Sequence, residues 1–258
     1  MTRPPLNRIF LLSHMRANTS LIGHILGSHP EISGYLEMHQ SYRSRNDLRL
    51  QQQRYSSTDT IKHSSRYLFD KILHDEYKFQ PAQLDLDSTK ILVSTRAAEP
   101  SIKSIIRLFS NKPEAHPYAD PEQATAYYIQ RITTLAEFCR QNKRGYYYLD
   151  AELIRTATDN SLKKLQQWLE LSSPLTSQYQ LFSQTGKPGA GDSSANISSG
   201  SIVEQQSNYD GIQLPAHFIS AAESVLKRLK PVMLDNAIDS ISCEVNRIGS
   251  EAISEKIV

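Results

Sequence analysis

Arg16, Thr19 and Ser20 are the residues near the start of the chain whose types and spacing are best suited to chemistry. They follow an apolar, strand-like run that begins at Ile9, and apolar residues at helical spacing come after them. The first turn of a helix leaves backbone N–H groups unpaired and carries partial positive charge, so anions bind there. The segment therefore predicts an anion-binding turn between a strand and a helix. The alternative that the segment leaves open is a helix merely capped by Ser13 or Thr19.

The usual nucleotide-binding loop has Gly-Lys-Ser/Thr after four variable positions, and this pattern does not occur in the chain. An ordinary ATP or GTP site is therefore not expected.

Residues 15–21, which read Met-Arg-Ala-Asn-Thr-Ser-Leu, resemble the 5′-phosphosulfate loop of sulfotransferases that use 3′-phosphoadenosine 5′-phosphosulfate (PAPS). In one large branch of that family the loop reads Pro-Arg-Ser-Gly-Thr-Thr-Leu, and His-Pro follows its helix, as His29-Pro30 does here. Met15 replaces the proline, which only loosens the turn, and Asn18 replaces the glycine. Asparagine is among the residues that best tolerate a left-handed backbone, so we expect the loop to keep its conformation.

A second match to this family lies in residues 90–109, where an apolar strand is followed by a helix with an apolar face. The resemblance implies that Arg96 and Ser104, eight positions later, hold the 3′-phosphate of the cofactor. A guanidinium can fork across a phosphate while a hydroxyl on the helix closes the other side. The alternative is an ordinary surface arginine and an ordinary helix serine.

A third match is the Gly/Ser-rich segment 183–201, which resembles the closing segment of many members of this branch. It implies that Lys187 and Gly189 contact the anionic cofactor, since glycine lets the backbone approach closely. A flexible linker between helices is the alternative.

The resemblance also implies the catalytic groups. The loop residues Arg16, Ala17, Asn18, Thr19 and Ser20 would bind the 5′-phosphosulfate, with Arg16 beside its bridging and sulfate oxygens. Lys71 would neutralise charge on the leaving-group side, and Glu37 would act as general base. His74 and His39 are the second candidates for the base, because a lone histidine is more often structural.

Length and composition fit one soluble α/β domain over residues 1–258, since 39% of the residues are apolar and 22% are charged. A net charge of +2 does not suggest a nucleic-acid partner. Cys139 lies on an apolar helical face, which indicates a buried free thiol. No apolar run is long enough to span a bilayer, and no signal-peptide core precedes the first strand, so we expect a cytoplasmic protein.

The expected elements alternate as in a parallel sheet flanked by helices, a P-loop-like sulfotransferase fold. We expect strands at 8–12, 90–95 and 146–149, and helices at 19–28, 100–110, 121–142, 160–171 and 215–230. Segment 41–66 is expected to form a polar helix or flap, and 231–258 a C-terminal tail.

The sequence therefore predicts transfer of a sulfuryl group from PAPS to a hydroxyl of a small-molecule, lipid or glycan acceptor, with no metal required. The alternatives are a kinase on a degenerate phosphate loop and a non-catalytic module that binds PAPS or its product, adenosine 3′,5′-bisphosphate (PAP). The oligomeric state is not predicted.

Overall fold

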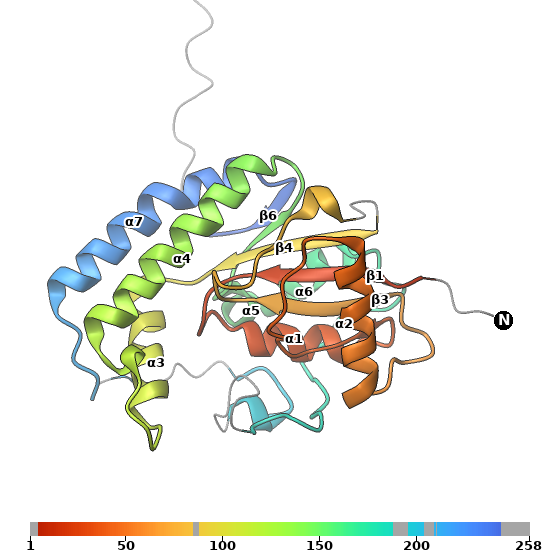
Figure 1. The fold of residues 1–258 in the computed structure, drawn as a ribbon, viewed down its shortest axis with the longest axis horizontal. Helices are drawn as coiled ribbons and strands as arrows, with labels where there is room; N and C mark the ends of the chain where they lie inside the picture. The colour runs from red at the N-terminus through yellow and green to blue at the C-terminus, as the bar shows by residue number, and fades with distance from the viewer. Residues whose placement is uncertain (1–4, 85–87, 188–195, 204–208, 210, 244–258) are drawn as a thin grey trace, which may run out of the picture.

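The computed structural model describes residues 5–84, 88–187, 196–203, 209 and 211–243. Among them a central sheet of six strands runs in the order β2-β3-β1-β4-β5-β6, with every neighbouring pair parallel (Figure 1). The strands are β1 (Asn7–Leu12), β2 (Ile32–Ser33), β3 (Tyr67–Ile72), β4 (Thr89–Thr95), β5 (Tyr147–Asp150) and β6 (Asp239–Ile241). All their carboxyl ends therefore meet at one edge of the sheet.

Helices cover both faces of this sheet. They are α1 (Thr19–Ser28), α2 (Arg45–Thr58), α3 (Ala98–Ser110), α4 (Pro121–Gln141), α5 (Leu153–Thr156), α6 (Thr158–Trp168) and α7 (Ala216–Asp235). Phe10 and Leu12 of β1 join a buried cluster with α3, α4 and α7, whereas Ile9 and Leu11 join a second cluster with α1 and α6. Because β1 is buried on both faces, its sequence from Ile9 to Leu12 is continuously apolar rather than alternating.

The parallel α/β fold is as the sequence predicts, and the predicted strands and helices are present with small shifts of their ends. The segment 41–66 contains the polar helix α2. Two features near the C-terminus differ from expectation, because α7 continues past Pro231 to Asp235 and β6 then adds an edge strand. Proline removes one helical N–H, which would have paired with the carbonyl of Lys227. Pro231 and Lys227 both lie on the exposed face of α7, where water can hydrate that carbonyl.

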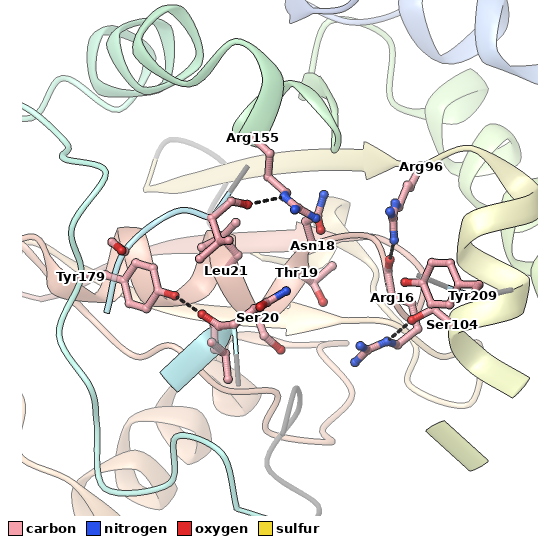
Figure 2. Close-up of a pocket in the computed structure, with 14 residues that line it drawn as sticks. Arg16, Asn18, Thr19, Ser20, Leu21, Arg96, Ser104, Arg155, Tyr179 and Tyr209 are labelled. Carbon is pink, nitrogen blue, oxygen red and sulfur yellow. Dashed lines mark hydrogen bonds between the residues drawn. The ribbon is translucent and has the colours of Figure 1, made fainter. Parts of the chain in front are cut away.

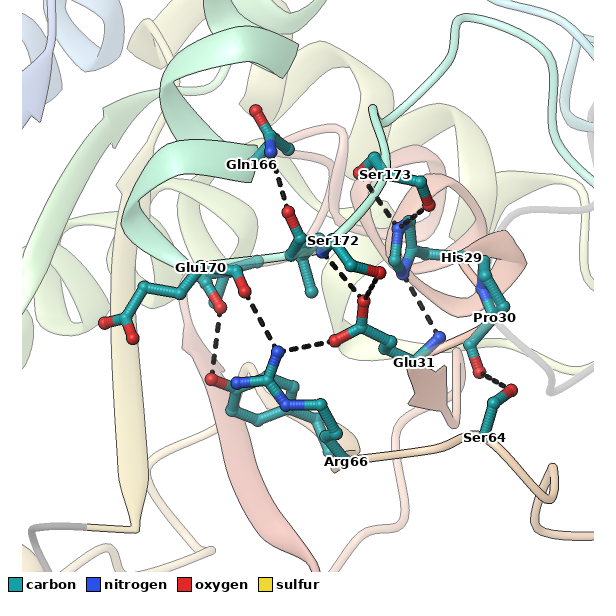
Figure 3. A network of polar contacts seen from close by, with 12 residues as sticks. His29, Pro30, Glu31, Ser64, Arg66, Gln166, Glu170, Ser172 and Ser173 are labelled. Atoms are coloured by element: carbon teal, nitrogen blue, oxygen red, sulfur yellow. Dashed lines mark hydrogen bonds and ion pairs between the residues drawn. The ribbon is translucent and has the colours of Figure 1, made fainter.

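A polar network closes the amino edge of the sheet, opposite the carboxyl ends of the strands (Figure 3). Glu31, just before β2, accepts hydrogen bonds from the Ser172 backbone N–H at 2.8 Å and from the Ser172 hydroxyl, and pairs with Arg66 at 2.6 Å. His29 contacts the Ser173 hydroxyl at 2.8 Å. The network therefore fixes the segment after α6 to the starts of β2 and β3.

No helix within the described part of the chain is long and apolar enough to cross a membrane. Cys139 is a buried free thiol, as its place on an apolar helical face predicts.

Candidate functional site

The turn between β1 and α1 has an unusual backbone. Arg16 and Asn18 both adopt positive φ, at 64° and 54°, and Asn18 is the left-handed N-cap residue of α1. Asparagine tolerates this region better than most residues, so the turn keeps the conformation for which the resembled loop uses glycine. Met15, in the place of proline, is buried, and its backbone N–H donates to the Tyr127 hydroxyl at 2.9 Å. Thr19 and Ser20 begin the first turn of α1, where the sequence predicts an anion-binding helix start.

This turn lines a cavity at the carboxyl edge of the sheet (Figure 2). Six of the residues that the sequence assigned to the cofactor contribute to its wall: Arg16, Asn18, Thr19, Ser20, Arg96 and Ser104. They come from the β1–α1 turn, the end of β4 and the middle of α3, so parallel β–α connections bring together groups that are far apart in sequence.

Cations and hydroxyls are paired within the cavity. The Nε of Arg16 donates to the Ser104 hydroxyl at 2.8 Å, so the Arg16 side chain points toward α3 (Figure 2). Arg96 follows β4, is 8% exposed, and donates from Nη1 to the Arg16 carbonyl at 3.2 Å. Arg16, Arg96 and Ser104 therefore form one hydrogen-bonded group of two guanidinium groups and a hydroxyl on the cavity wall.

His14 forms hydrogen bonds to the backbone on both sides of this group. Its Nε2 accepts the Arg96 backbone N–H at 3.0 Å, and its Nδ1 lies 2.8 Å from the Met15 carbonyl oxygen, to which it therefore donates. Complete burial is the main reason that the pKa of His14 falls to about 3. The ring is therefore neutral and links the β1–α1 turn to the end of β4.

Lys71 is the cation on the other side of the turn. It lies near the end of β3 and is 2% exposed, and its Nζ is 3.3 Å from the Ser20 hydroxyl in the first turn of α1. A buried ammonium is costly unless polar or charged groups surround it. Its place beside the helix start thus suits a site that receives negative charge.

The three candidate bases lie together at the same edge of the sheet. The Glu37 side chain is 10% exposed, its Oε1 accepts the Leu73 backbone N–H at 3.2 Å, and it lies 3.9 Å from Nδ1 of His39. Burial lowers the pKa of His74, and the negative charge of nearby Glu37 acts in the opposite direction. The carboxylate and the two histidines therefore form one cluster beside the end of β3.

Some predicted contacts are not brought to the cavity. Ala17 is fully buried, and Lys187 is exposed and absent from the cavity wall. Apart from Arg16, the predicted catalytic groups also lie outside this wall: Lys71, Glu37, His39 and His74. Gly189 and most of the remaining Gly/Ser-rich segment lie outside the described residues.

Sequence reasoning missed several residues of the wall, among them Arg155, Tyr179 and Tyr209 (Figure 2). Arg155 lies on α5 shortly after β5. Because Arg16 and Arg96 also follow strands, an arginine after a third strand could have been predicted to lie at the same edge of the sheet. The two tyrosines lie outside helices and strands, where no periodic pattern marks them.

No protein-family model matches the chain, and no curated protein matches it by sequence. Solved structures do match. A sulfotransferase domain from the curacin biosynthetic pathway aligns with a TM-score of 0.53 and 16% identity, covering 89% of this chain and 99% of that one. The sulfotransferase domain of the Synechococcus PCC 7002 olefin synthase aligns with a TM-score of 0.55 and 16% identity, covering 88% and 97%. At these identities the likeness concerns the fold, and the chain therefore has the fold of sulfotransferase domains.

Proposed function

We propose that the protein is a PAPS-dependent sulfotransferase that transfers the sulfuryl group to an acceptor hydroxyl. The observation that carries the proposal is the cavity in which the start of α1 faces Arg16, Arg96 and Ser104. One cavity thus offers two separate anion contacts, as a nucleotide with both 5′ and 3′ phosphates requires.

The chain's own groups fit the parts of this reaction. Thr19 and Ser20, with the N–H groups of α1, would hold the 5′-phosphate, and Lys71 beside Ser20 would neutralise negative charge on the sulfuryl group. Arg16, whose side chain bonds to Ser104, would instead contribute to the 3′-phosphate contact. In an in-line displacement the bond from sulfur to the 5′-phosphate oxygen breaks as the acceptor oxygen bonds to sulfur. Glu37 would take the acceptor proton, and PAP would leave.

The contribution of the 3′-phosphate to nucleotide binding gives the sharpest test. We expect PAP to raise the unfolding temperature more than adenosine 5′-phosphate or ATP does, because a tighter ligand stabilises more at equal concentration. Arg96→Ala should remove roughly 2–4 kcal/mol of PAP binding, since a buried charged partner is lost, and should change adenosine 5′-phosphate binding little. Arg107→Ala, an exposed arginine on α3, is the control.

The two alternatives give different results in the same measurements. A kinase on a degenerate phosphate loop would be stabilised by ATP rather than PAP. A non-catalytic module would bind PAP but transfer no labelled sulfate from PAPS to small-molecule, lipid or glycan acceptors in a cell extract. Sulfate transfer together with PAP binding supports the enzyme.

A further inference from the structure

The side chain of Asn18 makes contacts that a glycine at this position could not make. Its Nδ2 donates to the Ala151 carbonyl at 2.9 Å and to Oε2 of Glu152 at 3.1 Å. Both acceptors lie just past the end of β5. The N-cap of the phosphate-binding helix is therefore attached to a third strand end.

The other carboxylate oxygen of Glu152 faces Arg96. Its Oε1 lies 2.7 Å from both Nε and Nη2 of the guanidinium. The Arg96 side chain is 8% exposed and lines the cavity, whereas that of Glu152 is 38% exposed, so the ion pair is buried on the arginine side and open to solvent on the carboxylate side. One carboxylate thus connects the side-chain amide of Asn18, the N-cap residue of α1, with the arginine assigned to the 3′-phosphate.

This arrangement fixes the guanidinium in one orientation. Glu152 receives Nε and Nη2, and the Arg16 carbonyl receives Nη1. A guanidinium has five N–H donors, so contacts to these described groups leave one N–H on each terminal nitrogen for an anion. An arginine ordered beforehand loses less conformational freedom when it binds.

We propose that Asn18 and Glu152 are positioning residues that couple the 5′-phosphate turn to the 3′-phosphate contact by holding Arg96 in its binding orientation. This inference rests on the proposed function. Within it, Asn18 is a working replacement for the glycine of the resembled loop, because it keeps the left-handed backbone and adds the contact to Glu152.

A second effect of Glu152 must be separated from positioning. A carboxylate near a bound phosphate also repels it, so removing Glu152 relieves repulsion while it releases Arg96. Repulsion between partly exposed charges is screened by salt, to a Debye length of about 3 Å at 1 M, whereas the orientation of a side chain is not. Asn18→Gly changes no charge and is free of this ambiguity.

The experiment measures the dissociation constants of PAP and of adenosine 5′-phosphate at about 0.1 M and 1 M salt. We expect Asn18→Gly to reduce the preference for PAP by about three- to tenfold at both salt concentrations, because an unfixed arginine must be ordered on binding. Glu152→Ala should do the same at 1 M salt, and the double variant should lose no more than the worse single variant. Asn236→Gly removes a similar amide-to-carbonyl bond at the end of α7 and is the matched control.

Each contrary outcome has a distinct meaning. An unchanged preference for PAP in Asn18→Gly overturns the coupling. The coupling is also overturned if the double variant loses the product of the two losses that the single variants show. Tighter PAP binding by Glu152→Ala at 1 M salt would make Glu152 a competitor of the phosphate instead of a positioning residue. Equal weakening of both nucleotides would indicate a general structural role. Failure of the wild-type protein to prefer PAP would overturn the proposed function itself.

Discussion

Lys71 is a buried ammonium beside the first turn of α1, and its proposed role is specific to the sulfuryl group. PAP lacks that group, so Lys71→Met should lower kcat for sulfate transfer by about 10²–10³-fold and leave the PAP dissociation constant within about threefold. Methionine keeps most of the apolar stem, which limits the packing change. Lys78→Met, at an exposed lysine, is the control. A parallel loss of PAP affinity would show that Lys71 is a general phosphate contact.

Glu37, His39 and His74 are the three candidates for the general base. If Glu37 is the base, Glu37→Gln should lower transfer by about 10²–10⁴-fold, because it keeps size and hydrogen bonding but not basicity. PAP binding should survive. Glu76→Gln, at an exposed carboxylate nearby, controls for charge. Near-normal transfer in Glu37→Gln, combined with loss in His74→Ala or His39→Ala, would assign the base to that histidine.

Single residues were predictable where the chemistry is local. The left-handed backbone of Asn18 follows from its place in the loop pattern and from the tolerance of asparagine for positive φ. The contact from Asn18 to Glu152 depends on how the end of β5 is placed beside the β1–α1 turn. No sequence spacing encodes that placement, so Glu152 was not found.

At the scale of elements, the end of β3 and the turn after β1 each bury a titratable group. Burial is the main reason that the pKa of Asp70 rises to about 7, although hydrogen bonds from Tyr42 and the Met38 N–H favour the charged form. Between pH 4 and 7 the native state therefore holds a proton that the unfolded chain releases, so the contribution of Asp70 to stability falls as the pH rises. The contribution of His14, whose pKa is lowered to about 3, rises with pH between about 3 and 6.5.

Substitution can separate these opposed effects. Relative to the wild type, Asp70→Asn should gain stability as the pH rises from 4.5 to 6.5, with a limiting slope of roughly 1.4 kcal/mol per pH unit for one proton. Urea unfolding at several pH values measures this slope, and the exposed Asp235→Asn should show none. A flat difference for Asp70→Asn would mean that Asp70 is ionised over the whole range.

Elements were predictable where sequence periodicity and turn chemistry agree. Strand β4 followed by α3 is an apolar run and then an amphipathic helix, and both form near the expected limits. The end of α7 was less predictable, because Pro231 usually stops a helix. Strand β6 has three residues, and pairing with β5, rather than its own pattern, makes it a strand.

At the scale of the whole molecule, the carboxyl and amino edges of the sheet hold different groups of polar residues. The carboxyl edge holds the candidate site, whereas the amino edge holds the Glu31 network (Figure 3). The parallel fold was predictable because alternating strands and helices permit few topologies. The residues that complete the cavity were less predictable, since Tyr179 and Tyr209 come from segments that only the assembled molecule brings beside α1.

Because the Glu31 network and the candidate site lie at opposite edges of the sheet, we expect that stability and ligand binding can be changed separately. Burial would raise the pKa of Glu31, but hydrogen bonds from Ser172 and Arg66 outweigh it and lower the pKa below the usual value. The carboxylate therefore stabilises the fold above its unfolded pKa, near 4.5, and this contribution is lost as the pH falls through its folded value. Glu31→Gln should cost about 1–3 kcal/mol of unfolding free energy at pH 7, and less below pH 4.

The control for this change is Glu170→Gln, which removes the ion pair of a 70% exposed carboxylate with Lys90. It should cost clearly less unfolding free energy than Glu31→Gln, because exposed pairs contribute little. Denaturant unfolding measures both variants, and PAP titration of the folded proteins measures the site. PAP affinity should be unchanged in Glu31→Gln, because the network lies at the opposite end of the strands from Arg16 and Arg96. A loss of PAP affinity that follows the loss of stability would mean that the two edges are coupled through β1 and β3, and that the sheet is not a rigid support for the site.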